Sequence, residues 1–121
     1  MAIKFSNNAS APLASGINNS VTLLSVTTGQ GNLFPTLSGS DYFYATLVDS
    51  SNNIEVIKVT ARSGDSMTIV RAQDGTTARS YAAGDKIEVR VTAAGLAAIQ
   101  QEAIDGSTST LGSALAFSIA L

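Results

Sequence analysis

At 121 residues the chain has the length of one domain, and its formal net charge of -2 lacks the basic surplus that phosphate binding requires, so we expect no nucleic acid partner. The sequence holds no histidine and no cysteine, which excludes imidazole acid–base chemistry, thiol nucleophiles, disulfides and thiolate zinc sites. Charged residues make up only 13% of the chain, well below the usual share of about 25%, which suits a protein that is packed against others.

The chain begins MAIKFSNNAS, which lacks the apolar core of a signal peptide, and no apolar run reaches the roughly 18 residues of a membrane span. We therefore expect synthesis in the cytoplasm and no membrane partner. Ranges 2–5 and 13–17 are predicted to add edge strands or to lie extended. The first regular strand is predicted at 21–26, where it is ended by the glycines of 29–31.

Further strands are predicted at 41–48, 54–61, 66–71 and 86–92, joined by short polar turns. The strand at 54–61 changes phase at Val56 and Ile57, which indicates a bulge or burial on both faces. Gly64 supplies the positive φ that a tight hairpin after this strand needs. In 86–92, alternation places Ile87, Val89 and Val91 on one face. These elements predict a mainly β fold, a small antiparallel β-barrel or β-sandwich.

After Thr92, a candidate N-cap, the period changes to that of a short helix over 93–104, ended by the Asp-Gly pair at 105–106. The chain then finishes in an apolar segment, 111–121, too short to cross a bilayer. We expect a β-rich module at 1–92 and a C-terminal helix and tail at 93–121 that serve oligomerisation or docking. The predicted interface consists of Leu96, Ile99, Ile104, Leu111, Leu115, Phe117, Ile119 and Leu121.

No residue pattern points to catalysis, because a hydroxyl nucleophile such as Ser80 has no histidine to activate it. Glu55 and Glu88 could form a glycosidase pair, but alternation places both on the solvent side of their strands. Each Asp at 65, 74 and 85 adjoins or closely follows a glycine, as turn-forming Asp does, and their spacing does not provide a calcium loop. We expect no enzyme activity, no metal and no cofactor.

The tyrosines offer the one candidate ligand face. Tyr42 and Tyr44 share a face of the strand at 41–48 and could stack on a sugar, with Tyr81 as a third member. Packing in the core or at a subunit interface is the other interpretation that we keep.

The stretch RAQDGTTA, residues 71–78, followed by the Gly-Asp pair at 84–85, resembles a signature of a module that recurs in tailed bacteriophage proteins. The module occurs near the N-termini of tail fibres and in small virion proteins, and the resemblance covers about residues 4–96. It implies a non-enzymatic virion structural protein in which the loop holds its own shape, with Arg71 and Arg79 paired to Asp74, Glu55 or Glu88. The structural loop residues are Arg71, Asp74, Gly75, Thr76, Thr77 and Arg79.

Fibre proteins with this module continue for hundreds of residues, whereas this chain stops at Leu121. The resemblance therefore implies an accessory role on the virion, as a capsid decoration, a head-fibre base or a small tail adaptor. Its expected partners are other virion proteins of capsid or tail and further copies of itself, with a trimer as one form. The alternative is a host-surface, glycan-binding module of the tail-fibre type that uses the tyrosine face.

Overall fold

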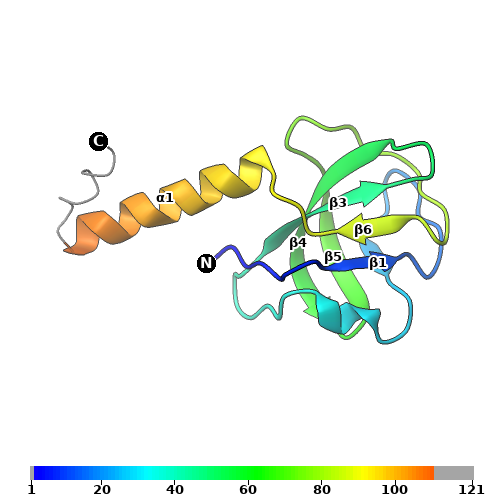
Figure 1. The fold of residues 1–121 in the computed structure, drawn as a ribbon, viewed down its shortest axis with the longest axis horizontal. Helices are drawn as coiled ribbons and strands as arrows, with labels where there is room; N and C mark the ends of the chain where they lie inside the picture. Colours follow the sequence, from blue (N-terminus) through cyan, green and yellow to red (C-terminus); the bar gives the residue numbers. More distant parts are fainter. Residues whose placement is uncertain (1, 111–121) are drawn as a thin grey trace.

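A computed structural model describes residues 2–110, with side chains given as far as residue 104. Its mainly β architecture confirms the predicted fold class: six antiparallel strands form one sheet, in the order β1-β6-β3-β4-β5-β2, which curls into a half-barrel (Figure 1). Within residues 2–110, no helix is both long and apolar enough for a membrane span. The elements are β1 (Ser10–Pro12), β2 (Leu23–Ser25), η1 (Gln30–Leu33), β3 (Phe43–Val48), β4 (Ile54–Ser63), β5 (Ser66–Gln73), β6 (Lys86–Glu88) and α1 (Ala93–Thr110).

The two outer strands of the sheet, β1 and β2, meet just beyond their ends. Leu13 forms an antiparallel bridge with Val26, and the Ala14 N–H donates to the Ser25 carbonyl at 2.9 Å. The segment predicted at 13–17 is therefore neither a regular strand nor extended throughout: Leu13 and Ile17 form isolated bridges, and the chain bends at Ala14 and Ser15 between them. Because these edges are linked, little unpaired backbone is left there for edge-to-edge association.

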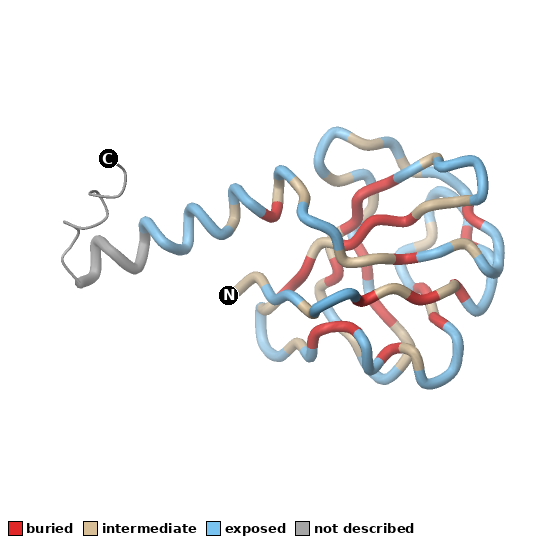
Figure 2. Tube along the Cα trace, in the orientation of Figure 1, coloured by how far each residue is buried: buried red, intermediate tan, exposed pale blue. Residues whose placement is uncertain are grey.

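The core lies inside the curl, where alternate residues of each strand point inward. On β3, Phe43, Ala45 and Leu47 are fully buried, and the ring of Phe34, which follows η1, stacks on that of Phe43 with 6.0 Å between centroids. Figure 2 shows the buried positions concentrated in the half-barrel, both in its strands and in the segments between them, while α1 is mostly exposed. Burial of a large apolar side chain contributes roughly 1.5–3 kcal/mol, so this interior is what stabilises the fold.

The predicted irregularity in the strand at 54–61 is confirmed. The pairing register between β4 and β5 shifts between Val56 and Lys58, and Glu55, Val56 and Ile57 are all buried. The extra residue at this shift lies on β5, where Ala72 has a positive φ of 55°, whereas β4 pairs with β3 in unbroken register. Glu55 therefore shares the inward face of Ile57 and Val59, and its predicted placement on the solvent side is wrong: its side chain is 0% exposed.

The predicted strand at 86–92 is only half formed. β6 ends at Glu88, with Ile87 fully buried, Val89 partly buried against the core and Val91 77% exposed. The last hydrogen bond to this edge of the sheet is the one from the Val89 N–H to the Ala9 carbonyl at 3.0 Å. Beyond Val89 the chain turns outward and starts the helix. Val91 therefore does not share the buried face predicted for it.

Helix α1 begins where predicted, with the Gly95 N–H donating to the Thr92 hydroxyl at 3.0 Å. It does not end at 105–106 but continues to Thr110, since a glycine inside a helix costs only about 1 kcal/mol. Figure 1 shows α1 projecting away from the half-barrel. The predicted interface residues after it, Leu111, Leu115, Phe117, Ile119 and Leu121, lie outside the described residues.

Candidate functional site

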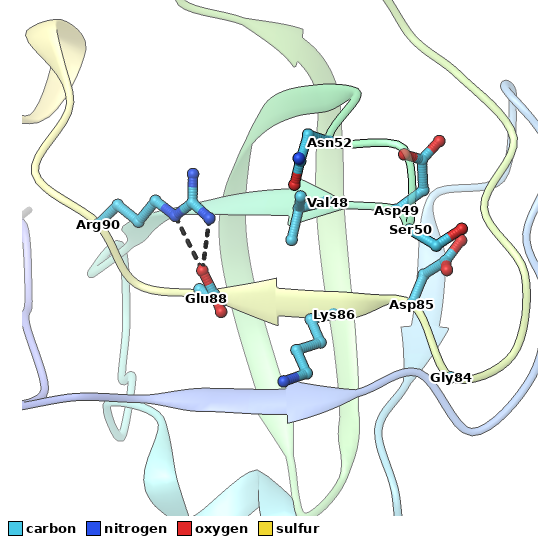
Figure 3. Close-up of a pocket in the computed structure, with 9 residues that line it drawn as sticks. All are labelled: Val48, Asp49, Ser50, Asn52, Gly84, Asp85, Lys86, Glu88 and Arg90. Carbon is cyan, nitrogen blue, oxygen red and sulfur yellow. Dashed lines mark hydrogen bonds and ion pairs between the residues drawn. The ribbon is translucent and has the colours of Figure 1, made fainter.

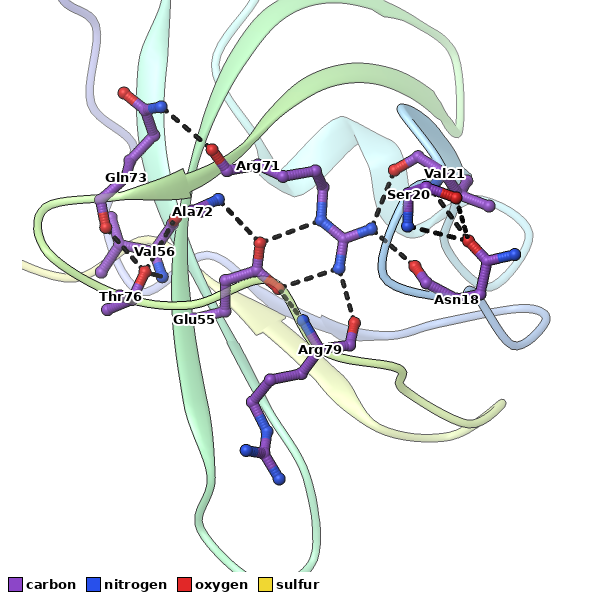
Figure 4. Close-up of polar contacts among 10 residues, drawn as sticks. All are labelled: Asn18, Ser20, Val21, Glu55, Val56, Arg71, Ala72, Gln73, Thr76 and Arg79. Atoms are coloured by element: carbon purple, nitrogen blue, oxygen red, sulfur yellow. Dashed lines mark hydrogen bonds and ion pairs between the residues drawn. The ribbon is translucent and has the colours of Figure 1, made fainter.

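The RAQDGTTA loop, residues 71–78, which we call the signature loop, is organised around the buried carboxylate of Glu55 (Figure 4). Arg71 donates to it twice, from Nε to Oε2 at 2.9 Å and from Nη2 to Oε1 at 2.8 Å. The backbone N–H groups of Ala72 and Arg79 donate to Oε2 at 2.9 Å and to Oε1 at 3.0 Å. Each carboxylate oxygen thus accepts two hydrogen bonds, which offsets the cost of burying the charge.

The same guanidinium ties three segments together. Its Nη1 donates to the carbonyls of Asn18 at 2.7 Å and Val21 at 2.9 Å, and its Nη2 also donates to the Arg79 carbonyl at 2.6 Å. The Arg71 side chain is only 8% exposed. Of the partners proposed for Arg71 from sequence, Glu55 is therefore the one found, and the residue is fully engaged within the protein.

The pKa of Glu55 reflects a balance of opposing effects. Burial raises it, but the hydrogen bonds from Arg71, Ala72 and Arg79, with the Arg71 charge, outweigh burial and hold the pKa below its usual value. The carboxylate is therefore ionised at neutral pH and its lone pairs are occupied. A group in that state does not act as a general acid or base.

Thr76 fixes the far side of the loop. Its hydroxyl accepts from the Val56 N–H at 2.9 Å, and its O–H donates to the Gln73 carbonyl at 2.6 Å. Asp74 and Gly75 both have positive φ, 55° and 77°, which makes the turn between them. Thr77, expected to act like Thr76, is exposed, and its side chain makes no hydrogen bond within the described part of the chain.

Asp85 and Asp65, both predicted to stabilise their own turns, behave differently. Asp85 does so, accepting from the Ala82 N–H at 2.8 Å. Asp65 instead accepts from the N–H groups of Gly29 at 3.0 Å and Gly31 at 2.9 Å, and so attaches the η1 region to the β4–β5 hairpin. Proximity in sequence to a glycine could not distinguish these two roles, because the partners of Asp65 are remote along the chain.

A surface hollow of about 410 Å³ lies beside β6, lined partly by Asp49, Asp85, Glu88 and Arg90 (Figure 3). Most of its charges have internal partners: Arg90 pairs with Glu88 at 2.7 Å, and Asp49 accepts from its own turn. Lys86, which also lines the hollow, makes no such hydrogen bond or ion pair within the described part of the chain. Within residues 2–110 no group of three acidic side chains is placed to hold a metal ion. Glu55 does not line this hollow, so the glycosidase pair considered from sequence is not assembled there.

The candidate ligand face does not form an exposed platform. Tyr42 is 8% exposed and Tyr81 only 3%. The Tyr42 and Tyr44 rings meet edge to face with 5.7 Å between centroids, and the Lys58 ammonium lies 4.5 Å from the Tyr42 centroid. Tyr81 bridges to Ile17 instead. The packing interpretation therefore fits Tyr42 and Tyr81, whose buried rings cannot stack on a sugar, while Tyr44 is partly exposed. The predicted face of three tyrosines is corrected, because only one of them reaches the surface.

The predicted interface residues on α1 are exposed: Leu96 is 55%, Ile99 42% and Ile104 49% accessible. At about 100° per residue, Leu96, Ile99 and Ala103 form one stripe, whereas Ile104 is turned away from it by a further 100°. We call this stripe the α1 apolar face.

Comparison with known proteins adds no identification, since no family model and no curated protein matches this chain.

Proposed function

We propose that this chain is a non-enzymatic structural protein of a bacteriophage particle, which docks through self-association of α1. The observation that carries the proposal is the exposure of Leu96 and Ile99 on a helix that projects from the half-barrel. Apolar surface of this kind on a projecting element marks an association site. A second copy with the same face would bury it.

The signature loop supports the same proposal. Arg71 and Glu55, which in another setting could serve catalysis, neutralise each other and hold three chain segments together. What the loop presents to the outside is a fixed shape rather than reactive groups. A capsid decoration, a head-fibre base and a tail adaptor all require such a rigid, chemically inert module.

The proposal is tested by the protein content of purified particles. We expect mass spectrometry of gradient-purified particles, made from a genome that carries this gene, to find several copies of the chain per particle. The variant Leu96→Gln/Ile99→Gln should be depleted from them. The control Leu23→Gln/Ile54→Gln removes the same side-chain types from the half-barrel, where they are 59% and 45% exposed, and should be retained. Absence of the unaltered chain from particles would overturn the proposal.

A further inference from the structure

Helix α1 is attached to the N-terminal segment at a point well beyond its first turn. The backbone N–H of Ile3 donates to Oε2 of Glu102 at 2.9 Å, across 99 residues of sequence. The segment around Ile3 is itself held at the start of β3, because the Lys4 N–H donates to the Tyr42 carbonyl at 2.8 Å and the Tyr42 N–H to the Ala2 carbonyl at 3.0 Å. Residues 2–4 thus connect the half-barrel to the helix.

The first turn of α1 packs on the same segment. Gly95 is buried, and a Cβ added there would lie 3.8 Å from both Ile3 Cδ1 and Tyr44 Cδ2. Gly95 and Glu102 are seven residues apart, so they lie on one side of the helix, roughly 10 Å from each other along its axis. Two attachments on one side fix both the tilt of a helix and its rotation about its own axis.

The pKa of Tyr42 is consistent with a Glu102 carboxylate placed close to the start of β3. Burial raises the pKa of the Tyr42 phenol, and the nearby Tyr44 and the negative charge of Glu102 raise it further. Glu102 is therefore close enough to Tyr42, the residue before β3, to act on its phenol electrostatically.

We propose that Glu102 is a positioning residue: its hydrogen bond to the Ile3 N–H sets the rotation of α1 and so turns Leu96 away from the half-barrel. Leu96 lies about 100–120° around the helix from the side that carries Gly95 and Glu102, whereas Ile99 is only about 40–60° from that side. If α1 were free to roll, Leu96 could turn onto the half-barrel and be lost to a partner. The consequence for assembly rests on the proposed function, but the positioning itself does not.

Amide hydrogen exchange tests the attachment directly, because Ile3 donates to Glu102 while its neighbours donate to backbone. In Glu102→Ala we expect the Ile3 amide to exchange about tenfold faster, as for loss of one charge-assisted hydrogen bond, with Lys4 and Tyr42 unchanged. Glu102→Gln keeps an acceptor oxygen and should retain most of the protection. Gln100→Ala, at an exposed position two residues earlier on the helix, is the control and should leave Ile3 as it is. Equal exchange at Ile3 in the unaltered chain and in Glu102→Ala would overturn the inference.

Residual dipolar couplings test the orientation and separate the two proposals. In the unaltered chain the amides of α1 should fit the alignment tensor of the half-barrel, and in Glu102→Ala their couplings should shrink. Couplings that stay equal in both would refute positioning by Glu102. Both experiments are carried out at a concentration where light scattering gives a single species, so their results do not depend on self-association. A chain that never self-associates would contradict the proposed function but would leave the role of Glu102 intact.

Discussion

Replacing Glu55 by glutamine perturbs the buried centre of the signature loop with almost no change of shape. The carboxylate is fully buried, and each of its oxygens accepts two hydrogen bonds. In Glu55→Gln one oxygen becomes an NH2 group that faces two donors, so two hydrogen bonds are lost. The guanidinium of Arg71, whose side chain is 8% exposed, also loses its counter-ion.

The expected loss is about 4 kcal/mol in the free energy of unfolding, because breaking a buried ion pair by removing one partner costs about 3–5 kcal/mol. For a domain whose total stability is of the order of 5–15 kcal/mol, that is a large fraction. The matched control is Glu88→Gln, which breaks a pair whose side chains are 44% and 25% exposed. Exposed pairs contribute about 1 kcal/mol or less.

Urea unfolding followed by circular dichroism measures both variants. We expect the transition midpoint of Glu55→Gln to fall well below that of Glu88→Gln, with similar m-values. A loss in Glu55→Gln no larger than that in Glu88→Gln would refute the reasoning that this network holds the loop.

Three further predictions concern the same fold. Because the folded-state pKa of Glu55 is lowered, its contribution to stability is present above the unfolded-state pKa of about 4.3 and is lost as pH falls below that value. Urea midpoints of the unaltered chain should therefore drop between about pH 5 and pH 2, and those of Glu55→Gln should drop less steeply. A midpoint of the unaltered chain that does not change over this range would contradict the prediction. Thr76→Val leaves the Val56 N–H of β4 without its acceptor and should lower the free energy of unfolding in urea by about 1.5 kcal/mol, whereas Thr77→Val should leave it nearly unchanged. Equal losses in the two variants would argue against a specific role for Thr76. Gly31→Ala places a methyl group onto the Gly64 carbonyl oxygen, which cannot give way without moving the β4–β5 hairpin. We expect a loss of about 3 kcal/mol in the free energy of unfolding. An unchanged urea midpoint would show that η1 is not held in this contact.

The sequence predicted the sheet well where alternation and turn residues agreed. In the strand predicted at 66–71, Met67 and Ile69 are buried and Val70 is exposed, which is the alternation of a strand, and Gly64 makes the predicted hairpin with φ of 60°. Thr92 also caps α1 as predicted. These features are local, and each is decided by residues within a few positions of one another.

The errors arose where remote parts of the chain decide the outcome. Glu55 was placed in solvent because the strand at 54–61 has apolar residues on both faces, so alternation alone does not tell which face turns inward. The partners that offset its buried charge lie 16 to 24 residues away. The bonds of Asp65 to η1 and of Glu102 to Ile3 span still longer separations. A hydrogen bond across such distances leaves no periodic signal in a single sequence. The tyrosines were ambiguous for the same reason, since an aromatic residue on a strand suits both a core and a ligand face.

The most direct test of the central claim, self-association through the α1 apolar face, is the molar mass of the purified chain by light scattering. We predict a discrete oligomer for the unaltered chain and for Leu23→Gln/Ile54→Gln, and a folded monomer for Leu96→Gln/Ile99→Gln. An unaltered chain that stays monomeric over the accessible concentration range, or an oligomer that survives loss of both α1 side chains, would contradict it.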